Sequence, residues 1–164
     1  ASEDDSDIRE IKAELTSQGY IKAKKQPKGR TQNLKKSKPM HFVSSDGVDI
    51  YAGKSNVQND ELTLRFADAG DIWLHTKNIP GSHVIIKCGG AEVPERTLFE
   101  AAVIAAGFSK AKDSSKVPVD YTARKNVKKP GGAKPGMVIY ERNKTIYVDP
   151  DENLISKLEK SREQ

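Results

Sequence analysis

The sequence predicts an α+β fold, a largely antiparallel sheet with one buried central helix, preceded by a coiled-coil remnant helix. Several short segments of strand-forming residues are separated by turn-forming residues, which is typical of antiparallel strands. One longer segment, residues 94–107, is apolar nearly all round from Leu98 to Ala106. This composition predicts a helix packed against the sheet.

The amino-terminal segment predicts a short helix. Residues 7–18 place Ile8, Ile11 and Leu15 at the i, i+3, i+7 spacing of an amphipathic helix, and Gly19 is suited to end it. Because so short a helix is marginal alone, we interpret it as the end of a helical hairpin or coiled coil. The predicted organisation is a coiled-coil end at 1–20, a basic linker at 21–39, the folded domain at 40–150, and a helix or tail at 151–164.

The folded body is predicted to begin with a hairpin and a helix. The Asp-Gly pair at residues 46–47 lies between two apolar segments, which predicts a β-hairpin over residues 41–52. We assign residues 59–69 to a helix capped by Asn59 or Asp60, with a strand as the alternative.

A second hairpin is predicted over DIWLHTKNIPGSHVII, residues 71–86. Residues 78–81 form its turn, in which Pro80 precedes Gly81, and we expect Gly81 to have a positive φ. Residues 82–87 return as the second strand. Alternation divides the first strand into a core face with Ile72, Leu74 and Thr76, and a polar face with Trp73, His75 and Lys77.

The carboxy-terminal half is predicted to contain the central helix, a strand and a third hairpin. Pro94 is suited to open the helix and Gly107 to close it. Residues 117–122 predict a strand, and residues 137–150 predict a hairpin that turns near Asn143.

A glycine pattern resembling a phosphate-binding loop is rejected. In GVDIYAGKS, residues 47–55, five residues separate Gly47 from Gly53, whereas a P-loop has four. The intervening residues favour a strand, but a P-loop requires backbone amides that point at phosphate. Nucleoside triphosphate binding is therefore not expected.

Candidate metal and catalytic residues are present without a diagnostic pattern. His75 and His83 are separated by seven residues, and Cys88 or Asp71 would have to complete a site. Zinc ligands commonly have shorter spacing. No nucleophile elbow frames a serine. We predict no metal, no cofactor and no catalytic residue, and expect a protein that is not an enzyme.

Positive charge is concentrated in two segments. Residues 22–39 hold eight Lys or Arg and no acid, and residues 110–134 hold eight against Asp113 and Asp120. Two basic clusters on a nearly neutral body are typical of polyanion binding. A flexible solvated linker remains the alternative for the first cluster, and it too could bind phosphate.

The second cluster contains a glycine-rich segment. Gly131 and Gly132 allow the backbone to approach a ligand closely, and Lys128, Lys129 and Lys134 would neutralise phosphate.

The sequence also indicates a compartment. Cys88 is the single cysteine, which fits a reducing environment, and no apolar run approaches the roughly 18 residues of a spanning helix. The acidic start, ASEDDSD, lacks the apolar region of a signal peptide. We expect a cytoplasmic protein that does not enter a membrane.

Four segments together resemble the NFACT-R domain, the RNA-binding carboxy-terminal module of the NFACT proteins. This family includes NEMF and the bacterial RqcH type, often labelled fibronectin- or fibrinogen-binding protein FbpA. The resemblance covers residues 40–149, and residues 10–22 resemble the end of the family's coiled-coil region, which favours a fragment. The four segments are DIWLHTKNIPGSHVII, EVPERTLFEAAVIAAGFSKA, KVPVDYT and KKPGGAKPGMVIY.

The resemblance implies a part in ribosome-associated quality control. Such proteins bind the stalled large ribosomal subunit with its peptidyl-tRNA, and recruit alanyl-tRNA for mRNA-independent tailing of the nascent chain. The implied partners are ribosomal RNA and tRNA. Two alternatives stay open, an adhesin fragment that binds fibronectin or fibrinogen, and an enzyme acting on RNA or a small anion.

The resemblance also implies an RNA-facing edge built on the turn of the second hairpin. Four residues there are expected to face RNA, namely His75, Lys77, Ser82 and His83, with Trp73 beside them. The alternative for His75 is a buried residue bonded to the backbone of the turn at 78–81. The basic residues expected to bind RNA are Arg124, Lys125, Lys128, Lys129 and Lys134.

Overall fold

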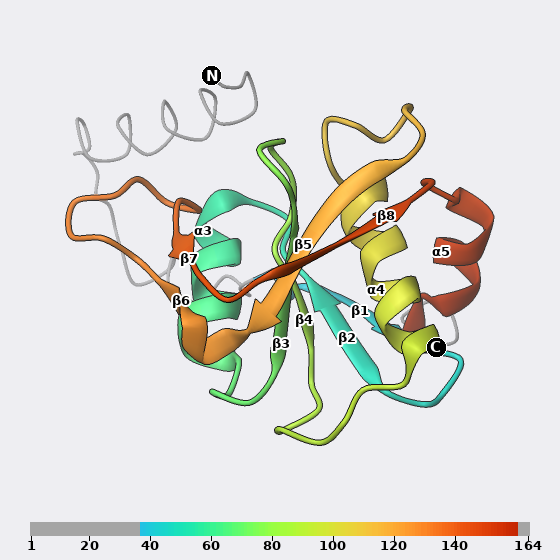
Figure 1. Cartoon of the computed structure of the whole chain (residues 1–164), viewed down its shortest axis with the longest axis horizontal. Coiled ribbons are helices and arrows are strands. Elements are labelled where there is room, and N and C mark those ends of the chain that lie inside the picture. Colours follow the sequence, from blue (N-terminus) through green and yellow to red (C-terminus); the bar gives the residue numbers. More distant parts are fainter. Residues whose placement is uncertain (1–36, 161–164) are drawn as a thin grey trace, which may run out of the picture. The chain divides into compact units, whose positions relative to one another are not determined.

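The computed structural model describes residues 37–160. Its main sheet has six strands in the order β1-β2-β4-β3-β5-β8, and β6 and β7 form a separate two-stranded sheet (Figure 1). All neighbouring pairs are antiparallel, so the predicted α+β fold is confirmed. The strands are β1 (Met40–Val43), β2 (Asp49–Ala52), β3 (Ile72–Thr76), β4 (Val84–Ile86), β5 (Val117–Ala123), β6 (Val127–Lys128), β7 (Ile139–Tyr140) and β8 (Lys144–Val148).

Helices pack on the sheet and connect its strands. The predicted helix over residues 7–18 and most of the predicted linker at 21–39 lie outside the described residues. The predicted carboxy-terminal helix or tail contains α5. The helices are α3 (Asn56–Asp60), the π-helical η1 (Glu61–Phe66), α4 (Glu95–Gly107), the 3₁₀-helical η2 (Arg124–Asn126) and α5 (Glu152–Leu158).

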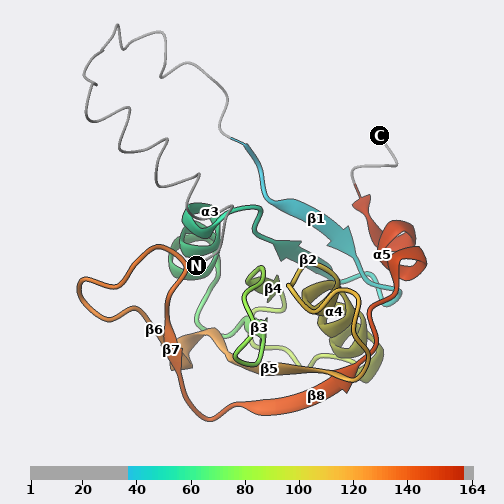
Figure 2. The ribbon, with the colours of Figure 1, turned by 90° about the horizontal axis from the view of Figure 1, so that it is seen from above.

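The sheet curves around α4, which contacts five of its strands (Figure 2). Residues 101–106 of this helix are all buried, and four of them are alanines. Because alanine side chains are short, strands can approach the helix closely on several sides. Pro94 precedes the helix and Gly107 is its last residue, as predicted.

The opposite face of the sheet is also buried. Leu62, Trp73, Ile85 and Val127 form a second apolar cluster, and Tyr140 packs against it. Helix η1 and the β6–β7 pair supply the residues that cover this face. The predicted polar face of β3 is therefore corrected at Trp73, which lies in an apolar cluster because elements distant in sequence cover it.

The first hairpin is confirmed, and the start of the helix that follows is corrected. Met40 pairs with Ala52 in the β1–β2 ladder. The helix begins at Asn56, because the Ser55 hydroxyl accepts a hydrogen bond from the Gln58 amide at 3.1 Å. Of the two predicted caps, Asn59 is buried within this helix and Asp60 is its last residue, so neither caps its start.

The carboxy-terminal hairpin predicted over residues 137–150 does not form. β7 pairs with β6, through Val127 opposite Tyr140, whereas β8 pairs with β5. Arg142, with a φ of 55°, lies where the chain passes from one sheet to the other. The two strands are neighbours in sequence but have different partners.

The turn of the second hairpin also differs from the prediction. Asn78 has the positive φ, 53°, and Gly81 does not. Gly81 instead forms a β-bridge with Ser109, and a Cβ on Gly81 would lie 2.8 Å from the Ser109 Cβ. Close approach of two segments, rather than backbone conformation, therefore explains the glycine.

Replacing Gly81 by valine is expected to lower the free energy of unfolding by about 1–3 kcal/mol, because the added side chain overpacks the contact with Ser109. Gly131→Val is the matched control, since a Cβ there meets nothing within 4 Å. Its effect should stay within about 0.5 kcal/mol. Urea denaturation measures both, and equal losses would contradict the steric explanation.

Candidate nucleic-acid interface

The basic ribbon, which we define as residues 127–140, comprises β6, β7 and the loop between them. Lys128 and Lys134 are exposed on it, and Lys125 is exposed in η2 immediately before it. Figure 1 shows this ribbon at one end of the domain and α5 at the other. These three lysines are the predicted phosphate-binding residues that the structure leaves most accessible.

The inner face of the ribbon is anchored in the second apolar cluster. The Val127–Tyr140 pair points inward, with Val127 buried and the Tyr140 ring centroid 4.6 Å from that of Trp73. The Tyr140 hydroxyl donates a 2.6 Å hydrogen bond to the Asp120 carboxylate. Burial, followed by this bond and the charge of Asp120, raises the pKa of Tyr140, so the phenol stays protonated.

The loop of the ribbon is fixed from beneath by Asp60. One carboxylate oxygen accepts from the Gly136 amide at 3.0 Å, and the other lies 3.3 Å from the Lys129 ammonium. Lys129 also donates to the carbonyls of Lys134 and Met137. Lys129 thus closes the loop internally, which corrects its predicted role as a phosphate ligand.

His83 lies under the same loop and is neutral. The Trp73 indole can only donate, so its 3.1 Å bond to Nδ1 makes that nitrogen an acceptor. Nε2–H then donates to the Gly136 carbonyl at 3.0 Å. Burial, together with the nearby His75, lowers the pKa of His83 to about 3, although the Gly136 carbonyl opposes this.

Two residues predicted to face RNA are therefore interior residues. The exposed fraction of His83 is 1%, and Trp73 is fully buried. The prediction of an RNA-facing position is wrong for both, because η1 and the ribbon cover this face of β3. Their hydrogen bonds support the interface from below instead.

His75 is half-buried beside them. Its ring stacks on Trp73 at 5.9 Å, and its Nδ1–H donates to the Thr76 carbonyl at 2.7 Å. Burial lowers its pKa, against the raising effect of backbone hydrogen bonds at Thr76 and Gly81. This placement favours the alternative in which His75 supports the turn.

Three other predicted residues make internal bonds and are only partly accessible. The Lys77 ammonium lies 3.3 Å from the buried Asp120, with 41% of its side chain exposed. The Ser82 hydroxyl donates to the Gly53 carbonyl at 2.7 Å. Arg124 donates to the carbonyls of Thr63 and Val127 and so joins η1 to the ribbon.

Asp71, considered above as a metal ligand, is bonded within the protein. Its buried carboxylate lies 2.8 Å from the Lys87 ammonium and accepts from the Gly89 amide at 2.7 Å. Burial disfavours the charged form, but these bonds outweigh it and lower the pKa of Asp71. Within residues 37–160, no group of three or more His, Cys, Asp or Glu side chains could hold a metal ion.

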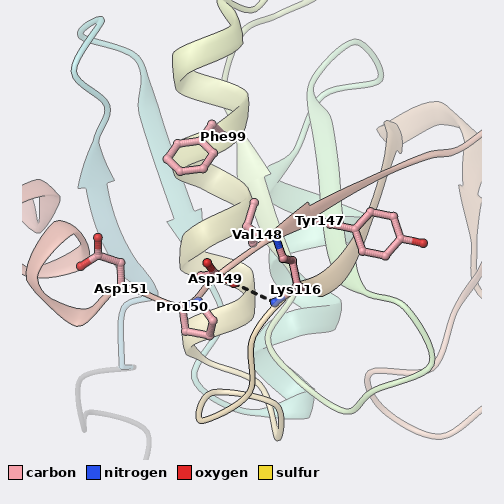
Figure 3. Close-up of a pocket in the computed structure, with 7 residues that line it drawn as sticks. All are labelled: Phe99, Lys116, Tyr147, Val148, Asp149, Pro150 and Asp151. Carbon is pink, nitrogen blue, oxygen red and sulfur yellow. Dashed lines mark hydrogen bonds between the residues drawn. The ribbon is translucent and has the colours of Figure 1, made fainter.

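A pocket of about 310 Å³ lies between α4, β8 and the start of α5 (Figure 3). Phe99 and Tyr147 line it together with Lys116, whose amide donates to Asp149 at 2.7 Å. Two of its lining residues, Asp149 and Asp151, are acidic. This mixed charge does not suit a polyanion, so the ribbon remains the better candidate.

Two accessible ribbon residues were missed by the sequence reasoning. Met137 and Ile139 are exposed, although both are apolar. The alternation of residues 137–140 was visible in the sequence. Its outward face could not be assigned, because the partner strand was misidentified.

The chain resembles known proteins over the same region. Residues 38–142 match the family described as NFACT protein RNA binding domain. The chain is 52% identical over 160 residues to the Rqc2 homolog RqcH of Bacillus subtilis (strain 168), covering 94% of this chain and 27% of that protein. It is 33% identical over 81 residues to the ribosome quality control complex subunit NEMF homolog of Drosophila melanogaster, covering 49% and 8% respectively.

A solved structure shows the same fold. It is the C-terminal part of the fibronectin/fibrinogen-binding protein from Streptococcus suis, 40% identical, with a TM-score of 0.78 over 96% of this chain and 62% of that chain. The chain spans about a quarter of the length of the Bacillus relative.

No helix within residues 37–160 has the length and apolar character needed to cross a membrane.

Proposed function

The chain belongs to the NFACT protein RNA-binding domain family, and from this premise we propose that it binds RNA through the basic ribbon. Lys125, Lys128 and Lys134 would neutralise phosphates, because they are exposed and lie within the matched residues. The observation that carries the proposal is the exposure of Lys128 and Lys134 on a ribbon whose loop is bonded from beneath by Asp60 and Lys129. A preformed loop loses little entropy on binding.

The larger role proposed is ribosome-associated quality control. The names of the Bacillus and Drosophila relatives support it. In this role a cytoplasmic protein would bind the stalled large subunit with its peptidyl-tRNA and recruit alanyl-tRNA for tailing. This domain would contact ribosomal RNA or tRNA without catalysing a reaction.

Fibronectin binding is the rival function, because the solved relative is described as a fibronectin/fibrinogen-binding protein. The two functions differ in their expected salt dependence and partner. Titrating the domain with ribosomal RNA, tRNA and fibronectin at two salt concentrations separates them. Saturable binding of fibronectin but of neither RNA would overturn the RNA proposal.

Replacing Lys125, Lys128 and Lys134 together by alanine is expected to weaken RNA binding and flatten its salt dependence. Each lost phosphate contact should reduce the slope of log affinity against log salt by about 0.7–0.9. Affinity measured between roughly 50 and 200 mM salt gives the slope. The melting temperature should hardly change, because all three side chains are exposed.

A matched control removes the same charge elsewhere. Lys112, Lys116 and Lys157 are exposed residues outside the ribbon. Replacing these three by alanine should leave the slope of log RNA affinity against log salt nearly as steep as in the wild type. Equal slopes for the two triple variants would mean that only net charge matters. Lys129→Ala should instead lower stability, because it removes the cation that closes the loop.

A further inference from the structure

The outer face of the basic ribbon carries two large apolar side chains. The exposed fraction is 56% for Met137 and 59% for Ile139. Val138 and Tyr140 pack against the second apolar cluster. Because neighbouring residues of a strand point to opposite sides and Tyr140 points inward, Ile139 points outward. Met137, two residues earlier, is exposed as well.

A lysine lies directly beside this apolar pair. Lys128 of β6 and Ile139 of β7 are cross-strand partners, so their side chains lie on the same face of the ribbon. Lys134 is exposed in the loop between the two strands. The outer face therefore combines apolar surface with positive charge.

The apolar pair is not needed to hold the ribbon. Val127 and Tyr140 already fix its inner face, and Asp60 and Lys129 fix its loop. Contact with phosphates alone would not use Met137 or Ile139 either, because neither can donate a hydrogen bond. These two side chains remain unexplained by folding and by charge neutralisation.

We propose that Met137 and Ile139 pack against the base or ribose of an unpaired nucleotide, while Lys128 and Lys134 contact the flanking phosphates. This inference rests on the RNA-binding function proposed above and names its substrate class. In an A-form duplex the base faces are stacked and hidden, whereas nucleotides in loops, bulges and single strands expose them. The preferred ligand is therefore RNA with unstacked nucleotides.

The charges favour RNA over a protein partner. Lysine is depleted in the buried cores of protein interfaces, because its ammonium must be desolvated there. Lys128 lies opposite Ile139 itself, so a protein covering the apolar pair would cover this lysine too. A nucleotide offers an apolar ring face and an anionic phosphate close together, which matches both kinds of side chain.

The experiment compares Met137→Ser/Ile139→Ser with the wild-type domain on three probes. These are an unstructured RNA oligonucleotide, a fully paired RNA duplex and inorganic polyphosphate, which has charge but no bases. Affinity for the unstructured oligonucleotide should fall about tenfold or more, given the apolar area that binding would bury. Affinity for polyphosphate and the salt slope on RNA should be unchanged.

Tyr147→Ser is the matched control, since Tyr147 is 63% exposed on β8 outside the ribbon. It should bind all three probes as the wild type does, and thermal melts should show that both variants are folded. A loss of affinity for polyphosphate equal to that for RNA would overturn the nucleotide contact.

The outcomes separate this inference from the function on which it rests. Suppose that Met137→Ser/Ile139→Ser binds the oligonucleotide as the wild type does, while the alanine variant of Lys125, Lys128 and Lys134 binds it more weakly. The inference then fails and the RNA-binding function stands. If the wild type binds neither RNA probe, the proposed function fails with it. A wild-type preference for the duplex over the unstructured oligonucleotide would also overturn the inference.

Discussion

Replacing Asp120 by alanine is expected to lower the free energy of unfolding by about 2–4 kcal/mol, because it removes the buried acceptor of two hydroxyl groups. Asp120 is buried in β5 and accepts hydrogen bonds of 2.6 Å from both Tyr140 and Thr145. It also neutralises Lys77 at 3.3 Å. One substitution therefore removes the shared acceptor of three side chains and leaves two hydroxyl groups without it.

Asp68→Ala is the matched control for this prediction. Asp68 forms a 3.2 Å ion pair with Lys87, but 74% of its side chain is exposed. Its removal should cost less than about 1 kcal/mol, because water solvates exposed charges well. Urea denaturation compares the two variants. A similar loss of unfolding free energy in both would mean that the buried hydrogen bonds of Asp120 contribute no more to stability than an exposed ion pair.

Asp120 also connects the core to the basic ribbon, because Tyr140 belongs to β7. Tyr140→Phe should therefore lower the free energy of unfolding. The double variant with Asp120→Ala should lose less free energy of unfolding than the sum of the two single variants. Simple additivity in this double-mutant cycle would contradict the coupling.

Local sequence patterns predicted the elements that local physics determines. The Asp-Gly pair predicted the β1–β2 hairpin, and Pro94 and Gly107 predicted the limits of α4. In each case the signal lies within or beside the element itself.

The errors concern contacts between residues distant in sequence. Alternation correctly predicted that Trp73 and Leu74 point to opposite faces of the sheet. It could not show that η1 and the ribbon cover the face with Trp73. The residues 137–148 contain two strands, and only long-range pairing decides that β7 joins β6 and β8 joins β5. Gly81 was expected to have a positive φ, but the close approach of Ser109 from another part of the chain is what leaves no room for a side chain there.

The candidate interface was predicted by charge and revised by geometry. Lys128 and Lys134 are exposed as expected, whereas Lys129, one residue from Lys128, is engaged with Asp60. The sequence does not distinguish Lys128 from Lys129. Only the contact of Lys129 with Asp60, 69 positions earlier, shows that Lys129 has a structural role. The exposed apolar residue Ile139 was missed because its exposure depends on which strand pairs with β7.

Acidification from pH 6 to pH 4 is expected to destabilise the domain, with His83 contributing about 1.4 kcal/mol per pH unit. The pKa of His83 is lowered from its ordinary 6.5 to about 3 in the folded state. Between these values the unfolded chain binds a proton at this residue and the folded protein does not. Stability from His83 is therefore complete above pH 6.5 and falls as pH decreases towards 3.

Other groups shape this acid dependence. Burial lowers the pKa of His75 as well, so this histidine adds to the loss over part of the same range. The lowered pKa values of Asp71 and Asp120 act at lower pH, because their ordinary value is 3.8. Their stabilisation is present above that value and is lost as pH falls further. The His83 effect is therefore best measured between about pH 4 and pH 6.

His83→Gln isolates the contribution of His83, because glutamine can donate and accept hydrogen bonds but does not titrate. Urea denaturation from pH 4 to pH 6 should show a slope about 1.4 kcal/mol per pH unit shallower than that of the wild type. The imidazolium cannot accept from Trp73 Nε1, so protonation breaks the bond that lies beneath the ribbon. The protection of backbone amides near Gly136, whose carbonyl accepts from His83, is measured relative to the intrinsic exchange rate at each pH. This protection should fall in the acidified wild type and not in the variant. Parallel stability curves for the two proteins would show that His83 titrates normally and that the ribbon is held without it.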